Sequence, residues 1–221
     1  MKRESFGGSP VDASVSQKLT RPIRPQGETM SEDRTLSLST VTAVINAPYE
    51  KVNIADWLFN LPDAEYQRCS HAHIAAATTT TDDGIPMSIN VETIGDALMV
   101  QHYVGEIRER SRCVMVSISD AITAAGRNKV KVVWELSVAK IDDKSCLYSN
   151  HIHASATDEF LEFLEKHNIP FEQAKAARQQ ASDIHNREET PNFAKSLERL
   201  ALTGERVPNA KENAKAVAAS A

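Results

Sequence analysis

The order of sequence patterns along the chain constrains its fold more than any single motif. Apolar and small polar residues alternate from Leu36 to Val41, which is the period of two of a half-buried strand that continues to Ile45. Pro48 follows and suits the first turn of a helix. Strand-like segments fill residues 71–156, and helical patterns fill the rest. This order predicts an α+β fold in which a curved antiparallel sheet of about seven strands grips a C-terminal helix, with a cavity between them.

Composition excludes several classes of function. The net charge of -5, with basic residues dispersed outside the N-terminal segment, argues against a nucleic-acid partner. No apolar run approaches the roughly 18 residues of a membrane span, and the N-terminus lacks the apolar core of a secretory signal. The three cysteines are widely spaced, which favours reduced thiols over a structural zinc site. We therefore expect a cytoplasmic protein without membrane insertion.

Domain boundaries follow from local composition. Residues 1–33 are rich in Ser, Gly, Pro and charge, and we expect a disordered leader there, with Met30 as an alternative start. One domain is expected over residues 34–203, and a flexible tail over 204–221. Within the domain, Pro170 and the pair Thr190-Pro191 predict breaks that divide the C-terminal region into about three helices.

A hairpin around Gly95-Asp96 supplies the first candidate site. A two-residue loop would place Ile89 opposite His102 and Val91 opposite Val100, so these apolar residues would share one face. We expect that face to line the cavity and Glu92 to lie on the solvated outer face. A desolvated His102 could act as a general acid or base, or anchor a ligand. The alternative is a core histidine with a hydrogen-bond partner.

Other residues could complete a ligand site. Arg108, Arg110 and Arg112 alternate along a predicted strand, where they could bind an oxyanion or form an ordinary surface row. Trp134 could stack on a planar ligand or pack in the core. The predicted ligand-binding set is Met87, Ile89, Val91, Val100, His102, Arg110, Trp134, Phe160 and Phe163.

Histidine pairs supply the candidate metal ligands. His71 and His73, and likewise His151 and His153, form H-x-H pairs in which strand alternation would point both rings to one side. His185 and Glu189 lie four residues apart on a predicted helix. A metal centre would need three such groups to converge, with a carboxylate such as Glu92 or Asp120. No signature spacing is present, so we expect no metal cofactor; if a metal binds, the candidate ligands are His71, His73, His151, His153, His185 and Glu189.

Residues 44–52, VINAPYEKV, resemble the phrase with which members of the START-like (Bet v 1-like) superfamily turn from their first strand into their first helix. The resemblance covers about residues 35–187 and implies a helix-grip fold. The superfamily includes ligand carriers, lipid-transfer domains, aromatase/cyclases, a few metal-dependent hydrolases and catalytic domains of ring-hydroxylating oxygenases. It usually has one long C-terminal helix, so helices over 171–202 would be an addition, as a lid or a dimer contact.

Three functional hypotheses follow. The first is a carrier or sensor that binds a small hydrophobic or aromatic molecule between the sheet and the C-terminal helix. The second is a cyclase/dehydratase- or hydrolase-type enzyme that uses cavity histidines, with or without a metal. The third is a non-catalytic oligomerisation module, such as a homodimer joined through the C-terminal helices. That module predicts an exposed apolar stripe made by Phe193, Leu197, Leu200 and Leu202.

Overall fold

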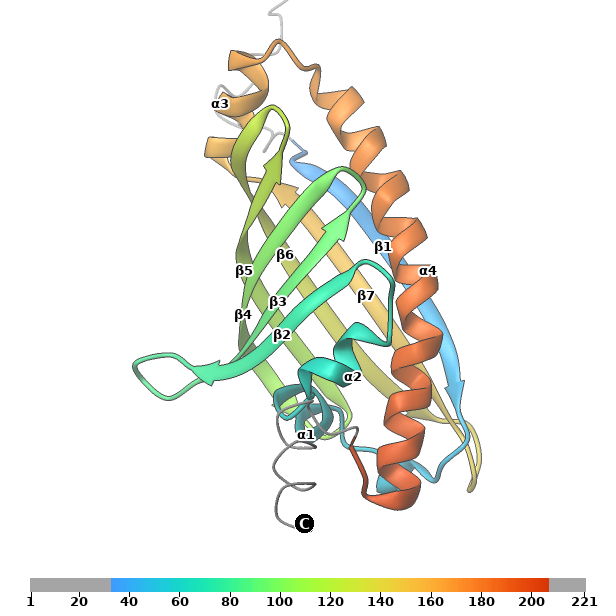
Figure 1. The fold of residues 1–221 in the computed structure, drawn as a ribbon. Coiled ribbons are helices and arrows are strands. Elements are labelled where there is room, and N and C mark those ends of the chain that lie inside the picture. The colour runs from blue at the N-terminus through green and yellow to red at the C-terminus, as the bar shows by residue number, and fades with distance from the viewer. Residues whose placement is uncertain (1–32, 207–221) are drawn as a thin grey trace, which may run out of the picture. The chain divides into compact units, whose positions relative to one another are not determined.

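Seven antiparallel strands form one sheet that curves around a long helix in the computed structural model, which describes residues 33–206 (Figure 1). The strands lie in the order β1-β7-β6-β5-β4-β3-β2. Their bounds are β1 (Thr35–Ile45), β2 (His73–Thr80), β3 (Pro86–Ile94), β4 (Ala97–Glu109), β5 (Arg112–Thr123), β6 (Gly126–Lys140) and β7 (Cys146–Ala156). The helical elements are the 3-10 turn η1 (Tyr49–Lys51), α1 (Ile54–Phe59), α2 (Asp63–Gln67), α3 (Asp158–Lys166) and α4 (Phe171–Thr203). This confirms the predicted α+β helix-grip architecture.

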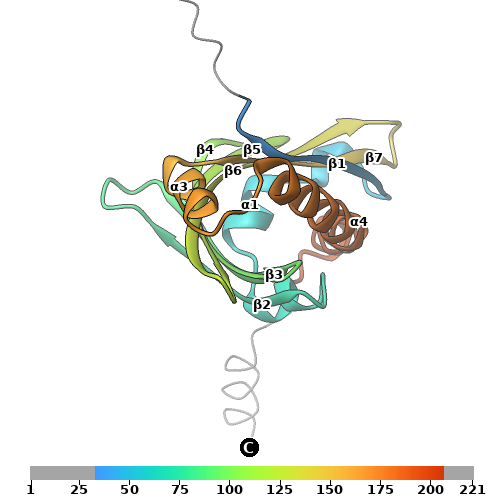
Figure 2. The same ribbon diagram turned by 90° about the horizontal axis from the view of Figure 1, so that it is seen from above.

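The helix α4 lies along the gap between the two edges of the sheet, β1 and β2, as the view from above shows (Figure 2). On the β1 side, the Gln179 side chain bonds both backbone groups of Leu38, at 2.9 Å to its N–H and 3.0 Å to its carbonyl oxygen. Ser182 and Ser37 share a hydrogen bond of 2.9 Å nearby. These contacts satisfy part of an exposed strand edge and fix α4 beside β1.

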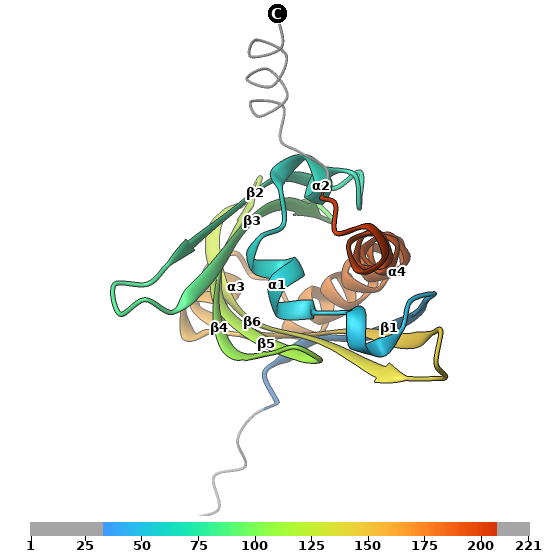
Figure 3. The ribbon, with the colours of Figure 1, turned by 90° about the horizontal axis from the view of Figure 1, so that it is seen from below.

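The short helix α1 lies between the sheet and α4 at the end of the fold away from α3, as the view from below shows (Figure 3). Asn53 caps it by accepting a hydrogen bond of 3.1 Å from the backbone N–H of Asp56. Trp57 packs edge-on against Phe193 of α4, with ring centroids 5.1 Å apart, and donates 2.7 Å from its indole nitrogen to Ser196 Oγ. The core is therefore closed at this end by aromatic packing between α1 and α4.

The expected break at Pro191 is wrong, because α4 continues through it as one helix of 33 residues. Pro191 itself is exposed, while its neighbour Thr190 is fully buried and donates 2.7 Å to Asn186 Oδ1. Residues on both sides of the proline pack against the sheet, and this packing offsets the hydrogen bond that proline removes. The break at Pro170 is confirmed, since α3 ends before it and α4 begins after it.

The β3–β4 hairpin has the predicted register, with Ile89 opposite His102 and Val91 opposite Val100. The two faces of this hairpin are the reverse of the expected ones: the polar face is directed inward and the apolar face outward. Glu92 and Gln101 are buried, and His102 is exposed. The reason is that the inner face of this hairpin meets polar side chains of α2 and α4, which supply hydrogen-bond and charge partners for buried polar residues. The apolar alternation of this hairpin therefore marks its outer face.

The apolar stripe expected on the C-terminal helices is largely internal. Phe193 and Leu197 are buried, Leu200 is half-buried, and Leu202 is exposed. The surface on which the oligomerisation hypothesis was based is therefore used inside the domain. A homodimer through these helices stays a prediction. No helix within residues 33–206 combines the length and the apolar character that a membrane crossing requires.

Replacing Phe193 with alanine should lower the free energy of unfolding by about 3–5 kcal/mol, because it opens a cavity between Trp57 and the sheet. Urea unfolding followed by circular dichroism would measure the change. The control is Leu202→Ala on the same helix, where 51% of the side chain is exposed, and the expected change is within about 0.5 kcal/mol. Equal losses in both variants would contradict the packing described here.

Candidate functional site

His73 opens strand β2 and is completely buried as a side chain. Its Nδ1 donates 2.7 Å to the backbone carbonyl oxygen of Tyr66, and its ring stacks on the Tyr66 ring with centroids 3.8 Å apart. Because a carbonyl can only accept, Nδ1 carries a proton, and the other ring nitrogen, Nε2, faces the interior within hydrogen-bond distance of Glu189 Oε2. This is the orientation that second contacts impose on metal-binding histidines.

Glu92 lies on the neighbouring strand β3, directly opposite His73 in the register. Its carboxylate is buried, and Tyr66 Oη donates 2.9 Å to its Oε2. Strand pairing therefore brings this carboxylate beside the histidine, and the phenol holds it in place.

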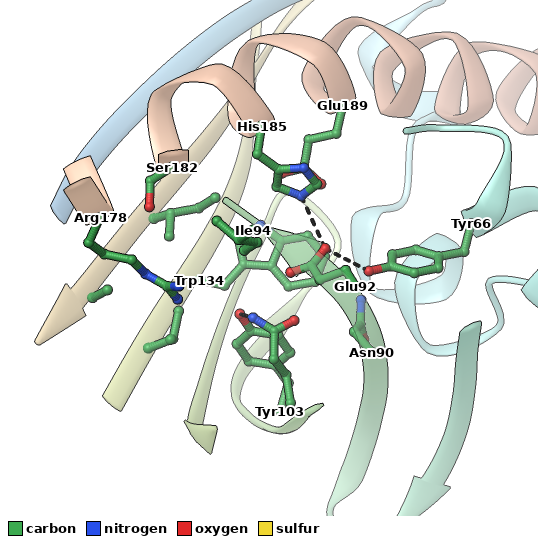
Figure 4. Close-up of a pocket in the computed structure, with 14 residues that line it drawn as sticks. Tyr66, Asn90, Glu92, Ile94, Tyr103, Trp134, Arg178, Ser182, His185 and Glu189 are labelled. Atoms are coloured by element: carbon green, nitrogen blue, oxygen red, sulfur yellow. Dashed lines mark hydrogen bonds and ion pairs between the residues drawn. The ribbon is translucent and has the colours of Figure 1, made fainter. Parts of the chain in front are cut away.

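His185 and Glu189 lie one turn apart on the inner face of α4, facing β3 (Figure 4). Both are buried. Asn150 of β7 donates 2.9 Å from Nδ2 to Glu189 Oε1, while its own Oδ1 accepts 2.8 Å from the Trp134 indole N–H. The fixed amide thus orients one oxygen of Glu189 toward β7 and leaves the other for the histidines.

The four side chains converge on one point. His73 Nε2 lies 3.2 Å from Glu189 Oε2 and 3.4 Å from Glu92 Oε2. His185 Nε2 lies 3.0 Å from Glu92 Oε2 and 3.3 Å from Glu189 Oε2. One ligand atom from each residue lies within 4.8 Å of all the others. Bonds of about 2.0–2.1 Å to a central zinc give tetrahedral edges of about 3.3 Å, and the four histidine–glutamate distances are close to that length.

The charges of the cluster stabilise one another. Burial raises the pKa of Glu189, but the charges and hydrogen bonds of His185 and His73 together outweigh it and lower that pKa to about 2. The pKa of Glu92 is lowered because the same two histidines together outweigh its burial. Burial lowers the pKa of His185, yet Glu189 and Glu92 together raise it to about 11. Burial and the charge of Glu92 raise the pKa of Tyr66, which therefore stays a neutral donor. Two buried carboxylates thus require positive charge, either as protons on the histidines or as a bound cation.

His185 favours the cation. Although its Nε2 lies close to both carboxylates, neither ring nitrogen has the alignment of a hydrogen bond within the described structure. A buried donor normally finds an aligned acceptor. A nitrogen lone pair directed at a metal ion between the carboxylates needs no such acceptor. The donor set of two imidazoles and two carboxylates therefore fits a divalent ion.

Two cavities lie above this cluster. The inner one, bordered by Tyr103, Trp134 and three of the cluster residues (Glu92, His185 and Glu189), has a free volume of about 20 Å³, enough for about one water molecule. The outer one measures about 670 Å³ and lies between α3, the start of α4 and the turns β3–β4 and β5–β6. Its lining includes Phe160, Phe163 and Leu164. Ile94 and Arg178 border both cavities and so lie where the two adjoin.

Comparison with solved structures identifies the architecture. The Zhui aromatase/cyclase from a Streptomyces species superposes with a TM-score of 0.55 at 10% identity, over 77% of this chain and 98% of that one. The chain has a START/Bet v 1-like fold.

Two further solved structures match less closely. A START superfamily protein from Mycobacterium smegmatis has a TM-score of 0.41 at 12% identity, over 65% of this chain and 94% of that one. Norcoclaurine synthase from Thalictrum flavum, in complex with dopamine and hydroxybenzaldehyde, has a TM-score of 0.43 at 14% identity, over 87% and 100%. No known family model matches the sequence, and no curated protein matches it.

Among the candidate metal ligands, the START/Bet v 1-like fold brings His73, His185 and Glu189 together. It separates His71, which is exposed in the turn before β2 and bonded at 2.7 Å to Glu188. His151 and His153 lie on the outer face of β7, since the residues alternating with them face the core. There they bond Thr40 Oγ1 at 2.7 Å and Thr35 Oγ1 at 3.3 Å.

The predicted ligand-binding residues divide in the same way. Trp134 lines the inner cavity, and Phe160 and Phe163 line the outer one. Arg110 is exposed in the turn between β4 and β5, because the arginine row spans a turn and not one strand. His102 does not line either cavity, and neither do the apolar residues on its face of the hairpin: Met87, Ile89, Val91 and Val100.

Sequence reasoning placed Glu92 on the solvated face, although it weighed this residue as a metal-binding carboxylate. It did not single out Tyr66, Asn150 or Arg178. One signal was available for the hairpin: the polar residues of 88–92 alternate as strictly as the apolar ones, and the paired strand continues them with Gln101 and Tyr103. A regular polar face on two paired strands is also what the wall of a polar cavity requires.

Asn150→Leu should lower the free energy of unfolding by about 3 kcal/mol, because it leaves the Trp134 indole N–H and Glu189 Oε1 buried without their partner. Urea unfolding would measure this loss. The matched control is Asn128→Leu on β6, whose buried Oδ1 has no hydrogen-bond partner in the described structure. Its expected loss is about 1 kcal/mol or less. An equal loss in the control would remove the orienting role of Asn150.

Proposed function

We propose that this protein is a metal-dependent enzyme of the hydrolase type, acting on a small, mostly apolar molecule held between the sheet and α4. The convergence of His73, Glu92, His185 and Glu189 on one point is the observation that carries this proposal. Burial of all four groups and the fixed orientation of His73 and Glu189 support it further.

The donor set suits zinc or another first-row divalent ion, because imidazole nitrogen and carboxylate oxygen are their common ligands. Two carboxylates would neutralise the charge of such an ion while both histidines stay neutral. Tyr66 and Asn150 would then act as outer contacts, holding Glu92 and Glu189 respectively.

A divalent ion that took a water as a fifth ligand beside these four residues would supply a Lewis acid and an activated water at neutral pH. The inner cavity beside the cluster has space for about one water molecule. In hydrolysis, the oxygen of that water joins the electrophilic carbon, the bond to the leaving group breaks, and the protons of the water are shared between the products. The apolar outer cavity would hold the body of the substrate and limit access of bulk water.

A carrier or sensor of a small hydrophobic or aromatic molecule is the second candidate. The outer cavity favours it, since about 670 Å³ of mostly apolar space suffices for binding without chemistry. The aromatase/cyclase Zhui shares the fold at 10% identity, so its activity does not decide between the two candidates. Metal binding and turnover do.

Chelator-treated protein should bind one Zn²⁺ per chain in isothermal titration calorimetry. Glu189→Gln and His185→Ala should each weaken binding by about 100-fold or more, because each removes one ligand from a four-ligand site. His102→Ala is the matched control: it removes an exposed histidine on β4 and should leave the affinity unchanged. Weak Zn²⁺ binding that is the same in all four proteins would contradict the metal centre.

Turnover separates enzyme from carrier. The Zn²⁺-loaded protein should release 4-nitrophenolate from 4-nitrophenyl hexanoate, and both chelation and Glu189→Gln should abolish this release. Tight Zn²⁺ binding without hydrolysis of this ester or of longer-chain homologues would contradict the hydrolase proposal and favour the carrier or sensor.

A further inference from the structure

We propose that Arg178 anchors the carboxylate of an amphiphilic acid whose apolar part fills the outer cavity. This names a substrate class for the proposed function, an acid that carries the bond to be hydrolysed in addition to its carboxylate. It rests on that function only in treating the bound acid as a substrate. Binding of the acid itself depends on the two cavities and on Arg178.

Arg178 lies where such an anchor is needed. It precedes His185 by seven residues on α4, so the two side chains share the inner face of the helix. Figure 4 shows its guanidinium directed into the inner cavity. Because Arg178 and Ile94 border both cavities, a group bound to Arg178 lies between the apolar space and the histidine–glutamate cluster.

Arg178 is half-buried, and its guanidinium lacks the carboxylate partner that a cation inside a protein normally has. Its Nε is buried and has no hydrogen-bond partner, and the contact of Nη1 with Met99 Sδ at 3.4 Å is to a weak acceptor. No carboxylate within residues 33–206 forms an ion pair with it. Burying a charge without a partner is unfavourable, and a bound carboxylate would remove this penalty through paired N–H···O bonds.

The surrounding charges leave Arg178 available to an anion. Burial lowers the pKa of Arg178, while the negative charges of Glu92 on β3 and Asp96 in the β3–β4 turn raise it. Tyr103 of β4 is kept neutral because burial raises its pKa. Glu92 and Glu189 are already balanced within the cluster, by protonated histidines or by a divalent ion. Asp96 is exposed at the rim of the outer cavity. Where the two cavities adjoin, the positive charge of Arg178 is therefore the one that no neighbouring group balances.

The outer cavity sets the nature of the remaining part of the acid. Its walls carry Phe160, Phe163 and Ile169 from the α3 side, with Ala174 and Ala177 of α4 opposite. These groups offer contact area and few hydrogen bonds, which suits an aliphatic or aromatic body. In a molecule with one carboxylate and one apolar body, the carboxylate would bind Arg178 beside the inner cavity and the body would fill the outer cavity.

The test compares decanoate with 1-decanol, two ligands of equal chain length of which only one is charged. Isothermal titration calorimetry on the full, chelator-treated chain should show that decanoate binds about 10-fold or more tightly than decanol. Arg178→Met should abolish this preference while keeping the affinity for decanol, and Arg178→Lys should retain part of it. Retained decanol binding shows that the Met variant is folded.

A second pair of variants tests the cavity. Ala177→Trp should block binding of both ligands, because it fills the outer cavity, whereas Ala176→Trp adds the same ring at the adjacent position of α4, outside that lining, and should not. An unchanged preference for decanoate in Arg178→Met would overturn the anchor. Failure of the wild-type chain to bind either ligand would overturn the substrate class. Both results stand whether or not Zn²⁺ binds, so they are distinguishable from failure of the metal centre.

Discussion

Mutual neutralisation of four buried ionisable groups is the constraint on which the interior of this protein depends. Two carboxylates and two imidazoles lie within contact distance, away from solvent and between the sheet and α4. None of them could be buried alone, because an isolated charge in such a place is strongly unfavourable. Each carboxylate also has a neutral donor, Tyr66 for Glu92 and Asn150 for Glu189, so the arrangement is built over several strands and helices. Polar residues on the inner faces of β3, β4 and β7 are a consequence of that cluster.

The single long helix is the second requirement of the site. His185 and Glu189 lie just before Pro191, and Phe193 and Leu197 lie just after it. A helix that ended at the proline would separate the cluster from the aromatic packing against α1. Because Phe193 is fixed by Trp57 and Trp134, the half of α4 that follows the proline holds in place the half that carries His185 and Glu189. Packing thus overrides the local preference of proline to interrupt a helix.

The order of elements and the hairpin register were predictable because both follow from alternation and turn residues, which are local properties. The faces of the hairpin were not, because burial of Glu92 depends on His73 and His185, which lie 19 and 93 residues away in the sequence. The pair His185 and Glu189 was visible at its helical spacing, but its partner strands were not. Pro191 misled for a similar reason: the contacts that keep the helix intact are with distant strands. Sequence patterns predicted which elements form here, and long-range charge pairing decided which way they face.

The contacts of α4 with the two edges of the sheet, β1 and β2, differ in kind. Along β1 the helix is bound by uncharged groups: Gln179 bonds the backbone of Leu38, and Ser182 and Asn186 bond the hydroxyl groups of Ser37 and Ser39. Toward β2 the contacts are made by side chains: Glu188 with His71, the four-residue cluster, and Asn192 with the carbonyl of Cys69. The strength of the contacts on the β2 side therefore depends on the charge state of the ionisable groups that make them. If the cluster binds a cation as proposed, its occupancy would change how firmly the helix and the far edge of the sheet are joined, so occupancy of the cluster would couple to the stability of the whole domain.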